Sequence, residues 1–83
     1  MDRAEAKERV AADVAARASD LVGVSHSIWD HPELCYEEHH AHDLLCDALE
    51  SGGMAVERGA FGLDTAFRAT AGTSGPTIVV CCE

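Results

Sequence analysis

The sequence lacks a long apolar run, an apolar N-terminal leader and any cluster of cations. No stretch approaches the roughly 18–20 consecutive apolar residues that span a bilayer. The N-terminus alternates charged residues with alanine and has no apolar segment of the kind found in secretory signals. We therefore expect a soluble, cytoplasmic protein with no membrane partner.

Cations are scarce and scattered. Six basic residues stand against fifteen acidic ones, which gives a formal charge of −9. Binding to phosphates needs a clustered basic patch. Nucleic acids and anionic membranes are therefore excluded as partners, because the cations are spread over the whole chain: Arg3, Lys7, Arg9, Arg17, Arg58 and Arg68.

The length of 83 residues allows one small domain or a part of a larger one. An apolar fraction of 47% is ordinary for a globular protein and excludes wholesale disorder. Four cysteines (Cys35, Cys46, Cys81 and Cys82) occur without an export signal, and the last two are adjacent. We expect reduced and mostly buried thiols.

Two helices are predicted in the first half of the chain. Apolar residues at helical spacing predict a helix over residues 2–30, which Pro32 ends. A second helix is expected over residues 36–51, with Glu37 and Glu38 in its first turn and Gly52-Gly53 as its stop. The expected buried faces comprise Val10, Val14, Ala18, Leu21, Val22, Ile28 and Trp29 in the first helix, and Ala41, Leu44, Leu45, Ala48 and Leu49 in the second.

Three strands are predicted in the second half. Alternating patterns indicate strands over residues 54–58 and 65–70, joined by a turn over 59–64. Residues 77–82 are apolar without alternation, which is typical of a strand covered on both faces. The order of two helices and three strands predicts an α/β fold that forms the front portion of a larger domain. A small α+β protein with this last strand as its core is the alternative.

The stretch from His31 to Cys46 is rich in histidine, cysteine and glutamate. Cys35, His39, His42 and Cys46 are a ligand set that suggests structural zinc. However, eleven residues of helix extend over about 16 Å, whereas zinc ligands converge within about 2.0–2.3 Å of one ion. Further ligands could come only from the last strand, at Cys81, Cys82 and Glu83. We therefore expect the histidines to face solvent or a subunit contact and the thiols to pack as small apolar groups.

The segment from Ile28 to His42 (IWDHPELCYEEHHAH) closely resembles the opening motif of the aminoacylase-type zinc metallopeptidases, in their amidohydrolase branch. The likeness is greatest to the Xaa-Arg (β-alanyl-lysine) dipeptidase subgroup. Residues 65–69 and 78–83 match the family's next two elements in order and spacing. The resemblance implies that the 83 residues form the N-terminal portion of a mixed-sheet catalytic domain.

The same resemblance carries expectations about chemistry. The family uses two divalent metal ions, usually zinc, and a glutamate base to hydrolyse N-acyl amino acids or small dipeptides, including some with a basic C-terminal residue. Its ligands follow the position matching Glu83, so we expect no catalytic residue and no metal ligand in this chain, and no activity from it alone. Pro32, Glu33, Glu37 and Glu38 match the family's scaffold motif.

Two other functions stay open from the residues. One is an acidic, self-associating module without enzymatic activity, in which a homo-oligomer covers the exposed strand by edge pairing. The other is a structural zinc protein that uses His39, His42 and Cys46.

Overall fold

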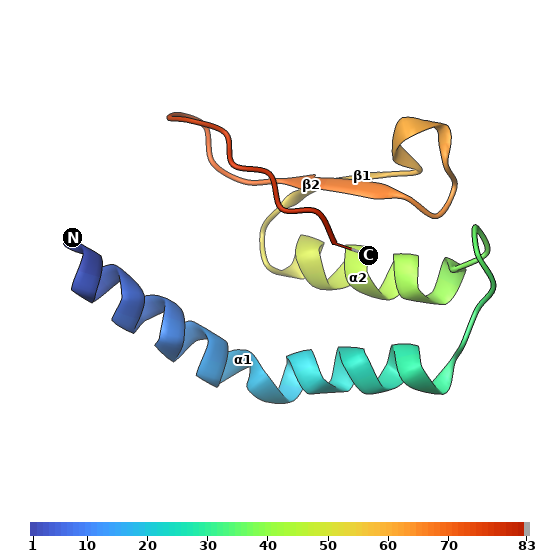
Figure 1. Cartoon of the computed structure of the whole chain (residues 1–83), viewed down its shortest axis with the longest axis horizontal. Coiled ribbons are helices and arrows are strands. Elements are labelled where there is room, and N and C mark those ends of the chain that lie inside the picture. The colour runs from blue at the N-terminus through green and yellow to red at the C-terminus, as the bar shows by residue number, and fades with distance from the viewer. Residues whose placement is uncertain (83) are drawn as a thin grey trace.

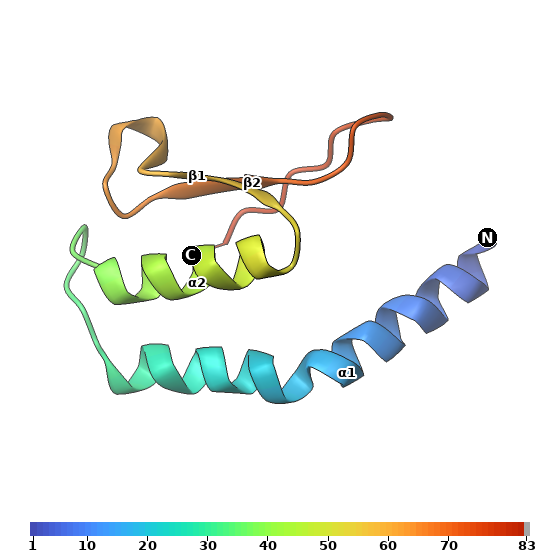
Figure 2. The same cartoon turned by 180° about the vertical axis from the view of Figure 1, so that it is seen from behind.

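The computed structural model describes residues 1–82 and arranges them in three layers (Figure 1). Helix α1 (Arg3–Asp30) lies against α2 (His39–Ser51), and α2 lies against a small sheet of β1 (Ala55–Arg58) and β2 (Phe67–Thr70). The view from behind shows the same order of layers (Figure 2). Helix α2 is therefore the layer that contacts both α1 and the sheet.

Helix α1 confirms the expected boundaries. The Asp2 carboxylate accepts a hydrogen bond from the Glu5 backbone N–H at 2.8 Å, and the Glu5 carboxylate accepts one from the Asp2 N–H at 3.3 Å. This reciprocal capping box satisfies two N–H groups that a helix start leaves without partners. At the other end the His31 N–H donates to the Ile28 carbonyl, and Pro32 follows.

Helix α2 begins three residues later than predicted. Tyr36 has a φ of 65°, a left-handed conformation that a helix cannot contain, so Glu37 and Glu38 precede the helix instead of forming its first turn. The predicted stop is confirmed: α2 ends at Ser51, and Gly53 takes a φ of 91°.

The side of α2 that is buried also differs from the prediction. Ala41, Leu44, Leu45 and Leu49 are half-buried, but Ala48 is exposed, and the buried residues of the helix are His42 and Cys46. The expectation that the histidines face solvent or a subunit contact is wrong for His42, which is buried within the chain. Its place one turn before Cys46 puts both side chains on the face that packs under the sheet.

Strands β1 and β2 confirm two of the three predicted strands in shortened form. They pair antiparallel, with Val56 opposite Ala69 and Glu57 opposite Arg68. Gly59 (φ 65°) leads into a short 3₁₀ turn, Ala60–Gly62, that connects them, and its N–H donates to the Ala66 carbonyl at 2.9 Å.

The third predicted strand is not formed. Residues 77–82 are exposed and lie in no ladder, so the expected burial of Cys81 and Cys82 is wrong, as it is for Cys35. The physical reason is that neither β1 nor β2 pairs with this segment, and no helix of residues 1–82 covers it. Glu83 lies outside the described residues. The fold is thus two helices followed by a two-stranded antiparallel sheet.

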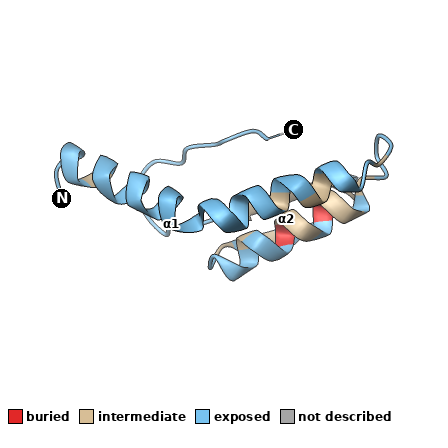
Figure 3. Ribbon diagram, turned by 90° about the horizontal axis from the view of Figure 1, so that it is seen from below, coloured by how far each residue is buried: buried red, intermediate tan, exposed pale blue. Residues whose placement is uncertain are grey.

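The core of residues 1–82 is small and centres on α2 (Figure 3). Cys46 is 0% exposed and Ala60 is 1% exposed, and His42 joins them. Helix α1 has no buried residue. With 28 residues it is about 42 Å long, whereas the 13 residues of α2 cover about 20 Å, so the N-terminal half of α1 extends past α2 (Figures 1 and 2).

Much of the apolar face predicted for α1 is therefore uncovered, including Val10, Val14, Leu21, Val22 and Trp29. Among the residues described, no helix combines the length and the apolarity that crossing a membrane requires.

Candidate functional site

The turn between α1 and α2 is organised by the carboxylate of Glu33. Its Oε2 accepts a hydrogen bond from the His40 backbone N–H at 2.7 Å, and its Oε1 accepts one from the Ala41 N–H at 3.0 Å. These donors belong to the first turn of α2, where backbone N–H groups have no partner within the helix. The His40 hydrogen bond, followed by that of Ala41 against some desolvation, lowers the pKa of Glu33. Glu33 is thus a helix cap supplied from the preceding turn.

Glu38 braces the same turn from the other side. Its carboxylate accepts a hydrogen bond from the Tyr36 N–H at 2.5 Å and one from the Thr65 hydroxyl at 3.3 Å. The first bond holds Tyr36 in its left-handed conformation, and the second ties the turn to the segment before β2. Glu37 is exposed, and its backbone links the turn by hydrogen bonds to Leu34 and His39.

Two histidines join the last turn of α1 to the first turn of α2. The rings of His31 and His40 stack with centroids 4.2 Å apart. Ser27 contacts both: its carbonyl accepts from His31 Nδ1 at 2.8 Å, and its hydroxyl lies 2.9 Å from His40 Nε2. Helical periodicity does not predict this role of Ser27, although its spacing of four residues from His31 is a signal of contact on a helix.

His42 and Cys46 form the buried side of α2. His42 Nδ1 lies 2.9 Å from the Asp43 carboxylate, and its ring meets Phe67 of β2 edge-on with centroids 6.0 Å apart. His42 Nε2 has no hydrogen-bond partner in the described part of the chain. Burial raises the pKa of the Cys46 thiol, an effect that Arg58 partly opposes. Cys46 is therefore held as a neutral thiol, as expected for a packed cysteine.

Arg58 connects β1 to the outer face of α2. Its guanidinium donates to Asp47 at 2.7 Å and to Glu50 at 3.0 Å, and it lies 3.7 Å from Asp43. The hydrogen bond to Asp47, followed by that to Glu50, holds the pKa of Arg58 above its usual range. In the sequence Arg58 is only one of six scattered cations, because the three carboxylates that face it are 8, 11 and 15 residues away along the chain.

The residues present do not fit a metal centre. Cys35 and His39 are exposed, His42 turns toward Phe67, and Cys46 is buried with a raised pKa, although zinc binds the thiolate. Within residues 1–82, no three His, Cys, Asp or Glu side chains are grouped so that they could hold an ion. The structural zinc hypothesis on His39, His42 and Cys46 is therefore not supported.

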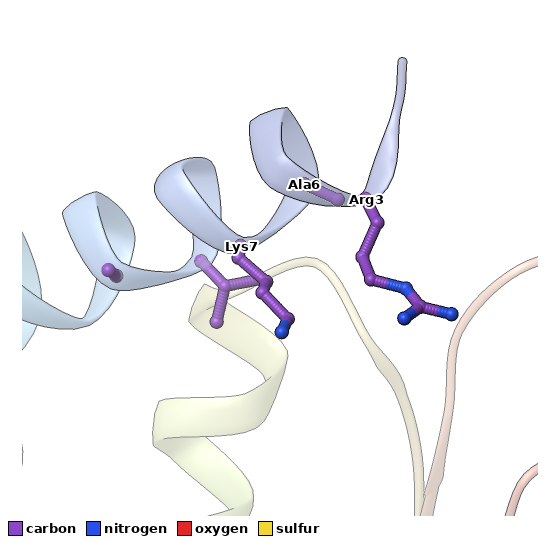
Figure 4. Close-up of a pocket in the computed structure, with 5 residues that line it drawn as sticks. Arg3, Ala6 and Lys7 are labelled. Atoms are coloured by element: carbon purple, nitrogen blue, oxygen red, sulfur yellow. The ribbon is translucent and has the colours of Figure 1, made fainter.

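A shallow hollow lies elsewhere, on the first turns of α1, lined by Arg3, Ala6, Lys7, Val10 and Ala11 (Figure 4). All of its lining comes from one helix, and no group of polar side chains converges there. The turn at residues 31–42 thus remains the chemically densest part of the chain, and its contacts are those of a scaffold.

Comparison with known proteins agrees with the motif in this turn. Over 57 residues the chain is 39% identical to one of the subunits of p-aminobenzoyl-glutamate hydrolase from Escherichia coli (strain K12), a match that covers 69% of this chain and 12% of that protein. Over 67 residues it is 43% identical to Xaa-Arg dipeptidase of Mus musculus and 42% identical to that of Homo sapiens, covering 76% of this chain and 15% of each relative.

The resemblance expected from residues 28–42 is thus confirmed as a partial similarity. The matched stretch spans 12–15% of the length of these curated relatives. No protein-family model matches the chain. No solved structure matches it.

Proposed function

We propose that these residues are the N-terminal scaffold of a metal-dependent hydrolase that cleaves the amide bond of N-acyl amino acids or small dipeptides. The similarity to an Xaa-Arg dipeptidase and to a p-aminobenzoyl-glutamate hydrolase supports this class of reaction. Among the substrates of this class, the same similarity favours a dipeptide with a basic C-terminal residue.

The single observation that carries the scaffold role is the bracing of the turn by carboxylates. Glu33 fixes the start of α2, and Glu38 fixes the turn against the segment before β2. Glu33 and Glu38 therefore act by holding α1, α2 and the segment before β2 together, while Pro32 follows the end of α1 and Glu37 contributes only its backbone to the turn. The pair of zinc ions that this reaction class implies finds no ligand set among residues 1–82, so we assign these residues no step in the chemistry.

A chimaeric enzyme tests the proposal. The matched 67 residues of the mouse Xaa-Arg dipeptidase are replaced by those of this chain, and hydrolysis of a dipeptide with a C-terminal arginine is measured together with bound zinc. We expect the chimaera to bind zinc and to keep metal-dependent turnover. A folded, zinc-loaded chimaera without turnover would contradict the assignment.

Two carboxylate variants sharpen this experiment. Glu33→Ala removes the cap of α2, and we expect it to reduce the yield of folded chimaera and its turnover together. Glu37→Ala removes an exposed carboxylate for which the structure shows no side-chain hydrogen bond, and we expect little effect. An equal loss of folded yield and turnover in the two variants would show that the bracing role is assigned to the wrong residue.

The 83-residue chain itself provides the complementary measurement. We expect no metal-dependent hydrolysis when the purified chain is supplied with zinc and either an N-acyl amino acid or an Xaa-Arg dipeptide. Turnover that is abolished by chelation and restored by zinc would show that the chain carries a reaction centre of its own.

A further inference from the structure

A pair of histidines supplies the polar contacts that hold the end of α1 on α2 (Figure 1). No residue of α1 is buried, and Val24 and Ile28 near its end are only half-buried. Within residues 1–82, the one side-chain hydrogen bond between the two helices joins the Ser27 hydroxyl to His40 Nε2 at 2.9 Å. Beside it, the rings of His31 and His40 stack with centroids 4.2 Å apart. The place of this end of α1 therefore depends strongly on the two rings.

The hydrogen bonds of the pair do not depend on its charge. His31 Nδ1 donates to the Ser27 carbonyl at 2.8 Å, so Nδ1 carries a proton whether the ring is neutral or charged. His40 Nε2 faces a hydroxyl, which can donate to a neutral ring or accept from a charged one. Ser27 can thus stay bonded to both rings in every protonation state, and the contact that responds to charge is the one between the rings themselves.

Two protonated rings repel each other across this stack. Histidine changes its charge between about pH 5 and 8, and the rings of His31 and His40 lie within 26° of parallel. At an effective dielectric constant of about 20, unit charges 4.2 Å apart repel by more than the energy that changes an equilibrium tenfold. A single proton places its charge against a neutral ring and produces no such repulsion.

The surroundings of the pair favour one positive charge and provide no partner for a second. The pKa of Glu33 is lowered mainly by hydrogen bonds from the His40 and Ala41 N–H groups, and the positive charges of His40 and His39 add to this. No ion pair in the described part of the chain joins the ring of His31 or His40 to a carboxylate. The other charged groups of the adjoining segments are Asp30 in α1, Glu37 and Glu38 in the turn, and Asp43 in α2, which bonds to His42. One carboxylate, Glu33, therefore serves two imidazoles of α2.

We propose that His31 and His40 form a pH-sensitive latch, which holds the end of α1 on α2 while the pair carries at most one proton and releases it when both rings are protonated. The stacked state binds fewer protons than the released state, so a fall in pH through the histidine range favours release. The contacts between α2 and the sheet stay in place, because they rest on His42, Cys46 and Arg58. The latch goes beyond the hydrolase assignment and does not depend on it.

NMR of the imidazole groups tests the latch in the 83-residue chain. At pH 8 we expect nuclear Overhauser contacts between the rings of His31 and His40, with the proton of His31 on Nδ1. Between pH 8 and pH 5 these contacts should disappear as the second ring of the pair takes up its proton, whereas those between His42 and Phe67 should persist. Rings that stay in contact when both are protonated, or that are not in contact at pH 8, would overturn the proposal.

A phenylalanine variant tests whether the charge of the pair is the cause. His31→Phe keeps an aromatic ring in the stack and removes one of the two charges. We expect the unfolding equilibrium constant, measured by denaturant titration, to rise between pH 8 and pH 5 by a factor about tenfold smaller in His31→Phe than in the wild type. Each variant is compared with itself at the two pH values, so a general loss of stability does not affect this factor. His26→Phe makes the same exchange at an exposed histidine of α1 and should keep the wild-type factor.

Ser27→Ala separates the latch from a merely structural contact. This variant removes the hydroxyl that bonds to His40, and it keeps both rings and the Ser27 carbonyl. We expect it to lower stability equally at pH 8 and pH 5. A wild-type pH dependence in His31→Phe would refute the latch, and so would a pH dependence that is lost in His26→Phe. Loss of the pH dependence in Ser27→Ala but not in His31→Phe would place the sensor in the hydrogen bond instead of the stack, which also contradicts the proposal.

Discussion

Replacing Cys46 by serine should destabilise the protein more than any other exchange of one atom in the chain. Cys46 is 0% exposed and lies between α2 and the sheet, beside the few other buried residues of the described chain. The substitution buries a hydroxyl in place of a thiol that packs as a small apolar group. A buried hydroxyl without a partner costs about 1–3 kcal/mol of unfolding free energy.

That cost is a large share of the total free energy of unfolding of a protein of this size. At about 0.05–0.15 kcal/mol per residue, 83 residues provide about 4–12 kcal/mol, and the small core of this chain favours the lower end. Each kcal/mol lowers the midpoint of thermal unfolding by about 4–8 °C in a domain of 60–100 residues.

Thermal unfolding followed by circular dichroism measures the effect. The control is Cys35→Ser, the same exchange at an exposed position, which should change the midpoint by less than about 4 °C because surface substitutions usually stay within about 0.5 kcal/mol. Equal midpoints for the two variants would refute the reasoning, because they would show that Cys46 is not in a packed core.

Further predictions concern the turn, the glycines and the thiols. Gly53→Ala should lower the free energy of unfolding by about 1–2 kcal/mol, because its φ of 91° disfavours a side chain. Gly23→Ala in α1 should raise the free energy of unfolding by about 0.5–1 kcal/mol. Denaturant titrations in which both variants change the free energy of unfolding in the same direction would contradict this. The lowered pKa of Glu33 means that its contribution to stability is present above its unfolded pKa and is lost as pH falls through the folded one, so Glu33→Gln should flatten the acid side of the stability profile. The pKa of Cys46 is raised, so its effect on the pH dependence of stability runs in the opposite direction. Stability should fall as pH rises above about 8.5, the ordinary thiol pKa, and Cys46→Ala should remove that fall. A colorimetric thiol reagent should find one slow cysteine, Cys46, and three fast ones, Cys35, Cys81 and Cys82; four equal rates would show that the α2 core opens freely.

The sequence was sufficient to predict the helices and strands whose signals lie within a few neighbouring residues. The stop at Gly53 and the alternation in residues 54–58 and 65–70 act over a few residues, and the structure confirms the helix end and the two strands that they predict. The start of α2 was missed because Tyr36 adopts a left-handed conformation. A hydrogen bond to Glu38 holds it there, and helical periodicity does not register such a bond.

Burial was predicted less well, because it depends on what lies opposite each face. The apolar residues of α1 and of residues 77–82 have the patterns of buried elements, yet residues 1–82 supply no neighbour for most of them. His42 was expected to face solvent or a subunit contact, because one helix cannot bring the ligands of a zinc ion together, but its position one turn before Cys46 places it against Phe67. The resemblance of residues 28–42 to a known motif was readable from the sequence, whereas the contacts of Ser27 and Arg58 required the fold.

The layered order of the fold means that α1 and the sheet share few direct contacts and influence each other through α2. A shift of the hairpin formed by β1 and β2 therefore reaches α1 as a rotation or slide of one thirteen-residue helix, carried at one end by the stacked imidazoles of His31 and His40 and at the other by the guanidinium of Arg58. Mechanically the three layers are coupled in series, so their compliances add and the softest contact between two layers limits the stiffness of the whole.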